Sequence, residues 1–575
     1  MSNTTEQFVN IVLNGEKYST RANQTILQVA EEAGLKIPTL CHDPRIEPYG
    51  SRWVFLVKVE GARGFVPACA KKIREGLNIV PEDEEILTSR KIALELLLSN
   101  HSGDCKPPGT LTCPSNIDVQ GYVGLIANEK YSEALQLIKK DNPFPSVCGR
   151  VCPRPCEDAC RRNLVDTPVA IDWLKRYVAD LDLFSDESFD PPCVGPTGKR
   201  VAIVGGGPAG LSAASYLVQE GIKVTVFEGE EKAGGMLRYG IPDYRLPQDL
   251  LDAEIATISR LGVEIRTGMH LGRDISLDQL QKDYDAVILA LGAWKSRPMQ
   301  ITGEDLPCVI SGIEFLRKSA KGTPPSLGKR IAVIGGGNTA IDAARTSLRL
   351  GSQEVSIFYR RSRAEMPATE MEIEEALEEG VNINYLAAPV AIEKSSEGYL
   401  LTLIKMELGE PDASGRQRPV PVAGSEYKVQ VDTVISAIGQ FTDISPVMEK
   451  DTLLDKRGNF LSDPQTGATK IQGVFGAGDL VTGTDIAIRA IAGGKFAARS
   501  VMQYLEGKEV TAPFEFLVKK EVFKPVTSED LADKPKIPRN TMPVIPLEKR
   551  VSSFQEIELG FTEEQAKAEA ARCLE

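Results

Sequence analysis

The sequence predicts an α/β fold with two parallel sheets, because one strand–turn–helix–strand pattern occurs twice. Each copy starts with a short apolar run, at 201–204 and at 330–334, and passes through a glycine-rich turn into a helix. A second, β-branched run follows each helix, at 223–227 and at 354–359. A strand, a crossover helix and a second parallel strand form the βαβ unit of doubly wound folds. The two copies therefore predict two Rossmann-like domains.

The first glycine turn has the G-x-G-x-x-G spacing of a dinucleotide site. Its glycines permit a tight turn and a close approach of the backbone to a pyrophosphate, which the N-terminus of the following helix attracts. Glu228 stands at the end of the next strand, where a carboxylate can accept hydrogen bonds from ribose hydroxyls. A glycine turn without a ligand is the alternative interpretation. The predicted contacts of this turn are Gly205, Gly207, Pro208, Ala209 and Gly210.

The second copy ends differently, since no acid follows its second strand. Arg360, Arg361 and Arg363 stand there instead. A carboxylate would repel a 2′-phosphate, whereas guanidinium groups bind one through charge-assisted hydrogen bonds. We therefore expect FAD at the first site and NADP(H) at the second, with a solvated basic edge as the alternative role of the arginines. The predicted contacts of the second turn are Gly335, Gly337, Asn338 and Thr339.

Composition limits the classes of function. A chain of 575 residues is long enough for several domains. Its formal net charge of −13 argues against nucleic acid as a partner. No apolar run approaches the length of a membrane span, and the first residues lack the basic and apolar regions of a signal peptide. We expect a cytoplasmic protein.

The N-terminal residues 7–80 predict a small β-rich module with a hairpin turn at Asn14-Gly15. The stretch 40–70 resembles the [2Fe-2S] ferredoxin module at the start of complex I and iron-hydrogenase large subunits. The resemblance implies a β-grasp ferredoxin-like fold. In that family the stretch carries four cysteines.

Only the outer two of those four positions hold cysteine in this chain. Cys41 and Cys69 match them, while Arg52 and Phe55 occupy the inner two. A cluster held by cysteines needs four thiolates, or another donor such as histidine in place of one. We expect a ferredoxin fold that has lost its [2Fe-2S] cluster and serves as a docking surface. The alternative is recruitment of His42 or of a partner's residue.

Cysteines crowd into a stretch predicted to be helical, 86–185. In a cytosolic chain such crowding suggests metal ligands rather than disulfides, although cysteines also serve as small core residues. The stretch resembles the N-terminal iron–sulfur domain of the glutamate synthase small subunit and of dihydropyrimidine dehydrogenase, which implies one or two [4Fe-4S] clusters. The candidate ligands are Cys105, Cys113, Cys148, Cys152, Cys156 and Cys160.

The resemblance implies that one cluster is held by three of these cysteines. Relatives take its fourth ligand from the helix that follows. Here that helix offers Lys175 and Arg176, which are poor ligands, so Cys148 is expected to stand in. The three matched ligands are Cys113, Cys152 and Cys156.

The same resemblance assigns Cys105 and Cys160 to the other cluster, with His101 as a further candidate. Close relatives have a cysteine where this chain has Gly109. That departure weakens the second cluster.

From residue 199 to about 507, the two glycine turns and the stretches GGMLRYGIPDYRLP, YRRSRAEMPA and GVFGAGD resemble the glutamate synthase small-subunit (beta chain) family of FAD/NADPH oxidoreductases. The resemblance implies that the isoalloxazine lies against backbone at 235–237 and that Asp479 binds the ribityl chain, with an N-cap as the alternative role of Asp479. It also implies a helix N-terminus, near residue 484, that faces the reduced ring. The further flavin contacts expected are Gly235, Leu237, Gly292, Gly478, Asp479 and Ile486.

These features predict six segments. The tail carries no strong core pattern; its end resembles a segment that leads into a dicluster ferredoxin domain in longer relatives. Cys573 is either the remnant of a ligand there or an unpaired thiol on an exposed helix. The expected segments are 1–85, a degenerate ferredoxin-like domain; 86–190, a helical [4Fe-4S] domain; 191–310 and 431–510, the two parts of the FAD domain; 311–430, an inserted NADP domain; and 511–575, a C-terminal extension.

The expected reaction is hydride transfer between NADPH and FAD, followed by single-electron transfer to iron–sulfur centres. This chemistry needs no side-chain acid or base, so no catalytic residue is predicted. A disulfide reductase would need a pair of cysteines beside the flavin, and the flavoprotein half holds only Cys308. The expected partners are other redox subunits that carry iron–sulfur or flavin centres. A scaffold subunit with residual activity is the alternative.

Overall fold

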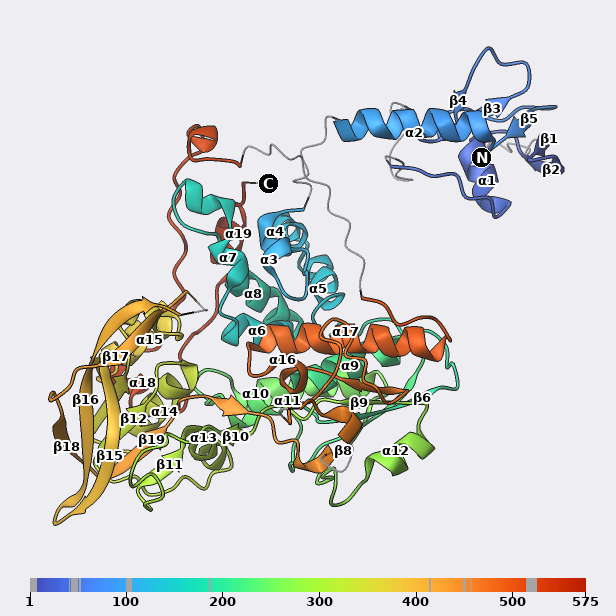
Figure 1. The fold of residues 1–575 in the computed structure, drawn as a ribbon. Coiled ribbons are helices and arrows are strands. Elements are labelled where there is room, and N and C mark those ends of the chain that lie inside the picture. The colour runs from blue at the N-terminus through green and yellow to red at the C-terminus, as the bar shows by residue number, and fades with distance from the viewer. Residues whose placement is uncertain are drawn as a thin grey trace. The chain divides into compact units, whose positions relative to one another are not determined.

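The computed structural model describes residues 8–40, 42, 50, 53–99, 106–185, 188–412, 415–447, 451–456, 458–512 and 525–574. The chain forms two compact units (Figure 1). The smaller unit comprises residues 1–105 with 516–525, and the larger comprises 106–515 with 526–575. No helix in the described part of the chain is long and apolar enough to span a membrane.

The smaller unit contains a five-stranded sheet in the order β2-β1-β5-β3-β4. The predicted hairpin at Asn14-Gly15 is confirmed, since both residues have the positive φ that a tight β-turn of this kind requires. Helix α1 begins at a capping box on Thr25 and buries one face against the sheet. The elements are β1 (Phe8–Leu13), β2 (Glu16–Arg21), α1 (Ile26–Glu32), β3 (Leu56–Val59), β4 (Val66–Pro67), β5 (Asn78–Val80) and α2 (Glu84–Ser99).

The first glycine turn lies in a parallel sheet of order β21-β9-β6-β7-β8. The predicted strand, helix and strand around the turn are confirmed as β6, α9 and β7. Helix α17 packs along α9, and both lie on one face of this sheet (Figure 1). The elements are β6 (Arg200–Val204), α9 (Pro208–Gln219), β7 (Lys223–Phe227), α10 (Met236–Tyr239), α11 (Gln248–Arg260), β8 (Glu264–Arg266), α12 (Leu277–Asp283), β9 (Ala286–Leu289), β21 (Val474–Gly476), α16 (Asp479–Thr482) and α17 (Ala487–Leu505).

The second glycine turn lies in a second parallel sheet, of order β11-β19-β12-β13-β14. The predicted strands and helix are confirmed as β12, α14 and β13. Antiparallel strands β15 to β18 extend from this domain, and the short antiparallel pair β10–β20 lies between the two parallel sheets in the chain. The elements are β10 (Lys295–Ser296), β11 (Val309–Ser311), α13 (Gly312–Ala320), β12 (Arg330–Ile334), α14 (Asn338–Arg349), β13 (Glu354–Tyr359), α15 (Glu370–Glu378), β14 (Asn382–Tyr385), β15 (Ala387–Ser395), β16 (Gly398–Pro411), β17 (Gln417–Pro421), β18 (Tyr427–Val431), β19 (Thr433–Ser436) and β20 (Gln440–Phe441).

The expected return to the first domain at residue 431 is wrong. Strand β19 pairs with β11 and β12, so it is an interior strand of the second sheet. Strand β11 joins the same sheet, although its residues 309–310 were expected in the first domain. A short apolar strand shows that it is buried but carries no signal for which of two similar sheets it enters.

The cysteine-rich stretch is helical, as predicted. Helix α6 packs on α8 at Gly149, where an added Cβ would lie 2.5 Å from the Cβ of Arg176. Glu254 of α11 accepts hydrogen bonds from the backbone N–H groups of Ser146 and Val147, so the first dinucleotide domain caps α6. The helices are α3 (Pro108–Thr112), α4 (Val119–Ala127), α5 (Tyr131–Lys139), α6 (Pro145–Val151), α7 (Pro155–Asp158) and α8 (Ile171–Leu183).

The expectation of an exposed C-terminal helix is wrong. Helix α19 (Glu563–Ala570) packs on α4 and α8, and Ala566 and Ala570 join the core beneath them. The fully buried Glu569 pairs with Arg572 and accepts the N–H of Ala170 at the start of α8. Because the contact between Glu569 and Ala170 is polar and joins residues far apart in sequence, hydrophobic periodicity could not reveal it.

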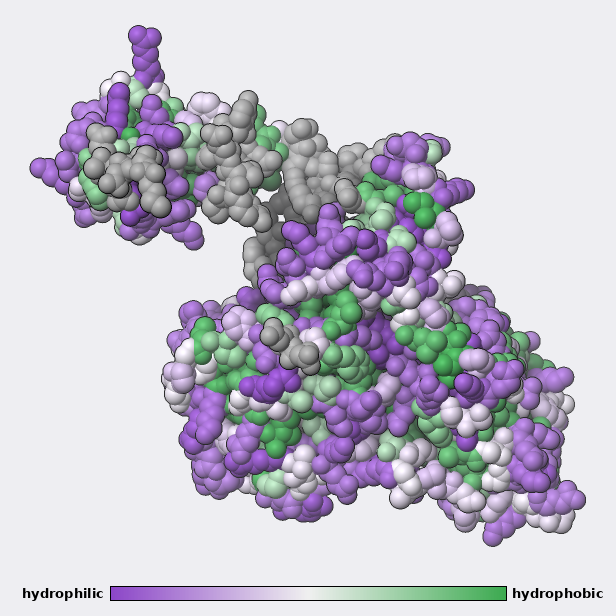
Figure 2. All heavy atoms as spheres, turned by 180° about the vertical axis from the view of Figure 1, so that it is seen from behind, coloured by the Kyte–Doolittle hydropathy of each residue, from purple (hydrophilic) through white to green (hydrophobic). Residues whose placement is uncertain are grey.

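Hydrophobic side chains of the larger unit form several separate patches among hydrophilic ones on the face shown in Figure 2. The exposed apolar residues of this unit are scattered over many elements. Scattered exposed apolar residues are ordinary for a folded protein.

Gly149→Ala should destabilise the helical segment by about 1–3 kcal/mol, because its new methyl group would overlap Arg176 at the α6–α8 contact. Gly124→Ala is the matched control: it lies within α4 with nothing within 4 Å of the added Cβ, and should be neutral or stabilising. Thermal melts and limited proteolysis of both variants would measure the difference. Equal stability of the two would contradict the described packing of α6 on α8.

Candidate functional site

A cavity of about 460 Å³ lies at the carboxyl ends of β6, β7 and β9. Ligands of open α/β sheets bind at this edge. The cavity brings together residues from stretches that are far apart in sequence. Of the predicted flavin contacts, it is lined by Gly205, Gly207, Pro208, Ala209, Glu228, Gly235, Leu237, Gly292, Gly478 and Asp479.

The glycines of the first turn differ in what surrounds them. A Cβ on Gly207 would meet nothing closer than 3.8 Å, so the backbone there is open to a ligand. A Cβ on Gly210 would lie 1.9 Å from the carbonyl oxygen of Gly205, so Gly210 permits α9 to pack on the strand and does not line the cavity. One open glycine and one glycine packed against the strand are what a turn that approaches a pyrophosphate closely requires.

Glu228 holds the glycine turn together. Its carboxylate accepts the backbone N–H groups of Gly206 and Glu230, both at 2.7 Å. Burial raises the pKa of Glu228. The residue also lines the cavity, which leaves it at the position expected for a ribose contact.

Asp479 lines the same cavity. The N-cap of α16 is Gly478, so the alternative role of Asp479 as a capping residue is wrong. Burial, and then the charge of Asp485, raises the pKa of Asp479 to about 7. Ile486 is the N-cap of α17 and does not line the cavity, but the next residue, Ala487, does. The positive end of the α17 dipole therefore faces the cavity.

The second glycine turn has a similar form. A Cβ on Gly335 would lie 2.3 Å from the carbonyl oxygen of Ala437, whereas Gly337 has nothing within 4 Å. Asn338 and Thr339 begin α14, and the buried Oδ1 of Asn338 makes no hydrogen bond to a described residue. An open glycine beside an unsatisfied polar group at a helix N-terminus fits a nucleotide phosphate.

The three arginines after β13 have different partners. Arg361 is buried and is held by Asp412 and by the carbonyl oxygen of Gln417. Arg363 pairs with Glu370 and Glu374 at the surface. Arg360 is exposed, and no hydrogen bond or ion pair joins its side chain to another described residue. Of the three, Arg360 is therefore the most available to a phosphate.

Cys113 and Cys152 are the C-caps of α3 and α6, and Cys156 lies in α7. The three lie near one another, since, after burial, the charge of Cys113 is among the causes that raise the pKa of Cys152, and that of Cys152 is among those that raise the pKa of Cys156. Burial, followed by the charges of Asp172 and Cys113 among others, raises the pKa of the Cys152 thiol to about 12. A Cβ on Gly109 would lie 3.7 Å from the Cβ of Cys156. Cys105 and His101 lie outside the described residues, and Cys160 is half-buried at the end of α7.

No three His, Cys, Asp or Glu side chains of the described residues are arranged to hold a single metal ion. A four-iron cluster makes a different demand, because each ligand binds a different iron and the ligands stand farther apart. Three cysteines converging from three helix ends fit that demand. Cys148 is fully buried nearby, and its Sγ contacts Asn142 Oδ1 at 3.9 Å.

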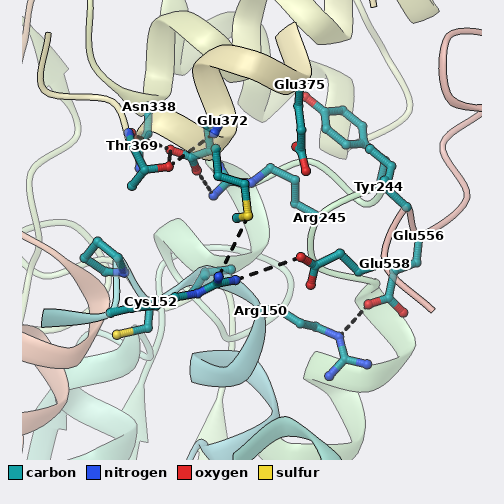
Figure 3. A pocket seen from close by; sticks show the side chains of 15 residues that line it. Arg150, Cys152, Tyr244, Arg245, Asn338, Thr369, Glu372, Glu375, Glu556 and Glu558 are labelled. Atoms are coloured by element: carbon teal, nitrogen blue, oxygen red, sulfur yellow. Dashed lines mark hydrogen bonds and ion pairs between the residues drawn. The ribbon is translucent and has the colours of Figure 1, made fainter. Parts of the chain in front are cut away.

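A smaller cavity, of about 100 Å³, lies between residues 150–154, which include Cys152, and the second glycine turn (Figure 3). Cys152 and Asn338 both line it. Arg154, which follows Cys152 in the loop, contacts the Sδ of Met371 on α15. Glu556 of the tail closes another side through its ion pair with Arg150. The two predicted sites are therefore neighbours.

Sequence analysis missed the ion pairs that join the two dinucleotide domains. Arg245, in the segment after α10, binds Asp342 of α14 through two hydrogen bonds and also pairs with Glu372 of α15. Glu230, after β7, pairs with Arg317 of α13 and with Lys321, the C-cap of that helix. The partners are separated by many residues, so no local pattern links them.

The chain belongs to the pyridine nucleotide-disulphide oxidoreductase family, which residues 199–494 match over more than half of the chain. Residues 99–186 match the family described as dihydropyrimidine dehydrogenase domain II, 4Fe-4S cluster. Residues 6–84 match a 2Fe-2S iron-sulfur cluster binding domain. The protein is an oxidoreductase with FAD and NADP sites and a [4Fe-4S] domain, as predicted.

Similar proteins include the NADP(+)-dependent formate dehydrogenase subunit beta of Moorella thermoacetica, 43% identical over 80% of this chain and 69% of its own. The NADPH-Fe(3+) oxidoreductase subunit beta of Geobacter sulfurreducens is 40% identical over 80% of this chain and 74% of its own. The glutamate synthase (NADPH) small chain of Escherichia coli is 36% identical over 68% of this chain and 88% of its own. The predicted resemblance to the last family is confirmed.

Glu254→Gln should flatten the dependence of stability on pH. Burial outweighs the two N–H bonds that Glu254 accepts and raises its pKa from the ordinary 4.5 to about 7. Between these pH values the Glu254 carboxyl group is ionised in the unfolded chain but protonated in the native protein. The free energy of unfolding therefore falls by about 3 kcal/mol as pH rises through this window. Thermal melts from about pH 5 to about pH 8 would measure this.

The matched control is Asp249→Asn, an exposed acid on the same helix. It should leave the pH dependence of the wild type unchanged. A Glu254→Gln profile as steep as the wild type's would show that the native Glu254 is already ionised.

Proposed function

We propose that the protein moves electrons between NADPH and the iron–sulfur centres of a multi-subunit oxidoreductase. One observation carries the proposal: helix α17 borders both the larger cavity, here called the flavin cavity, and the helical segment that carries the cysteines. Ala487 and Ala490 line the cavity, and Lys495 of the same helix pairs with Asp141 and donates to the carbonyl oxygen of Ser115. Ser115 lies two residues after Cys113.

The cavity residues and the cysteines also share one hydrophobic core. Ala209 and Ala490 of the cavity belong to the same buried cluster as Cys113 and Cys148. A continuous packed core keeps the two sites at a fixed separation and excludes water between them. Bound flavin supplies the conversion of a hydride into single electrons. The protein residues bind and orient the cofactors.

The similar proteins favour a subunit role. Those from Moorella and Geobacter are beta subunits, and the Escherichia protein is a small chain. We propose that the electron partner is another subunit that carries iron–sulfur or flavin centres. NADPH is the proposed nucleotide because no acid follows β13 and Arg360 is available to a 2′-phosphate.

We propose in addition that the N-terminal module binds no [2Fe-2S] cluster. Phe55, at one of the four ligand positions, is fully buried in the core of the smaller unit and has no lone pair to offer. Cys69 is buried beside it. The other two positions, Cys41 and Arg52, lie outside the described residues. A packed module without metal would serve as a docking surface.

Arg360→Ala should raise the Michaelis constant for NADPH about tenfold, since a lost charge-assisted hydrogen bond costs about 1.5 kcal/mol. NADH, which lacks the 2′-phosphate, should be unaffected. Arg361→Ala should instead loosen the contact with Asp412 and affect both nucleotides alike. Steady-state kinetics with both nucleotides would separate these outcomes, and Arg273→Ala, an exposed arginine of the first domain, is the control.

Cys152→Ala combined with Cys156→Ala should remove iron from the protein and abolish electron transfer to the partner. Bleaching of the flavin by NADPH should persist, because hydride transfer depends only on the two nucleotide sites. Iron analysis and anaerobic stopped-flow absorbance would test this. Undiminished transfer to the partner would mean that electrons leave the flavin by another route.

The reduced full-length protein should show no EPR signal of a [2Fe-2S] cluster at temperatures where four-iron clusters relax too fast to be seen. The physical reason is the missing pair of thiolates at positions 52 and 55. A stoichiometric two-iron signal would contradict the proposal. It would favour His42, whose buried Nδ1 makes no hydrogen bond to a described residue.

A further inference from the structure

The [4Fe-4S] site formed by Cys113, Cys152 and Cys156 needs a fourth ligand. Cys148 was the candidate from the sequence, because Lys175 and Arg176 are poor ligands. In the structure the Cys148 side chain is fully buried in the hydrophobic core, where its Sγ contacts Asn142. Cys148 therefore already has a structural role in the core.

Asp172 stands in the first turn of α8, one turn before Lys175. Its side chain is 1% exposed. Oδ1 accepts a hydrogen bond from Lys175 Nζ at 2.5 Å. Oδ2 is equally buried and accepts no hydrogen bond from any described residue. A buried carboxylate oxygen without a hydrogen-bond donor is rare and costly, so Oδ2 is open to a ligand that the described chain does not supply.

The neighbouring Arg154 does not donate a hydrogen bond to this oxygen. Arg154 Nε lies 3.7 Å from Asp172 Oδ2, beyond hydrogen-bond distance, and itself makes no hydrogen bond to a described residue. Arg154 sits in the left-handed conformation between Cys152 and Cys156, with φ of 65°, and its guanidinium stacks on Trp173. The loop that carries the two cysteines is thus held against the first turn of α8.

The Asp172 carboxylate also lies near the cysteines. After burial, its charge is among the causes that raise the pKa of the Cys148, Cys152 and Cys156 thiols. The backbone N–H of Asp172 donates to Glu157, the neighbour of Cys156, at 3.0 Å. Asp172 is therefore packed against the helix end that carries Cys156.

We propose that Asp172 Oδ2 is the fourth ligand of the [4Fe-4S] cluster held by Cys113, Cys152 and Cys156, and that Lys175 positions the carboxylate. This inference rests on the proposed function, since it assumes that the cluster is present. A carboxylate oxygen is an anionic donor that can replace one thiolate on one iron. The Lys175 ammonium fixes Oδ1 and leaves Oδ2 to the metal.

Asp172→Ala should leave one iron without a protein ligand, whereas Cys148→Ala should leave the cluster intact. Treatment of the full-length protein with ferricyanide should then remove iron from Asp172→Ala much faster than from the wild type, and should yield the EPR signal of a three-iron cluster. Asp172→Cys should restore a stable four-iron cluster with a lower midpoint potential, because thiolate replaces oxygen. Lys175→Met should retain four irons with a shifted potential.

The outcomes separate this inference from the proposed function. A wild-type protein without a four-iron cluster overturns both. A wild-type cluster that survives in Asp172→Ala but is lost in Cys148→Ala overturns only the inference and makes Cys148 the ligand. FAD content, which should be unchanged in every variant, shows that each has folded, and Asp172→Asn repeats the test with a side chain of the same shape.

Discussion

Helix α17 lies so close to α9 that a Cβ on Gly494 would stand 2.1 Å from the carbonyl oxygen of Ala209. This contact fixes two sites at once. Ala209 and Ala490, one on each helix, line the flavin cavity. Beyond Gly494, Lys495 holds the loop that follows Cys113. The flavin site and the cysteine site are therefore built on the same pair of helices, and neither can move without the other.

Ion pairs hold the second dinucleotide domain against the first. Arg245 and Glu230 reach from the first domain to different helices of the second, and Asp342 and Glu372 receive Arg245 in a nearly buried cluster. Buried ion pairs add little net stability but strongly penalise any arrangement that separates them. We infer that these pairs select one orientation between the domains, which suits hydride transfer over a short, fixed distance.

The sequence predicted both glycine turns, their strands and helices, and ten residues that line the flavin cavity, because short-range spacing determines each of them. It did not predict that β19 joins the second sheet, since an apolar strand does not specify its neighbours. It also missed the packing of the tail, where Glu569 and Arg572 are buried by contacts with residues about 400 positions away. The arginines after β13 were found as a group, but only the structure distinguishes Arg360 from Arg361.

Electron flow from NADPH through the flavin to the cluster is the central claim. Rapid mixing of the wild-type protein with NADPH under anaerobic conditions, followed by absorbance and by freeze-quench EPR, tests it most directly. The account predicts that the flavin absorbance bleaches first and that a four-iron cluster signal then appears. Complete flavin bleaching with no cluster signal, in protein whose cluster dithionite does reduce, would contradict it.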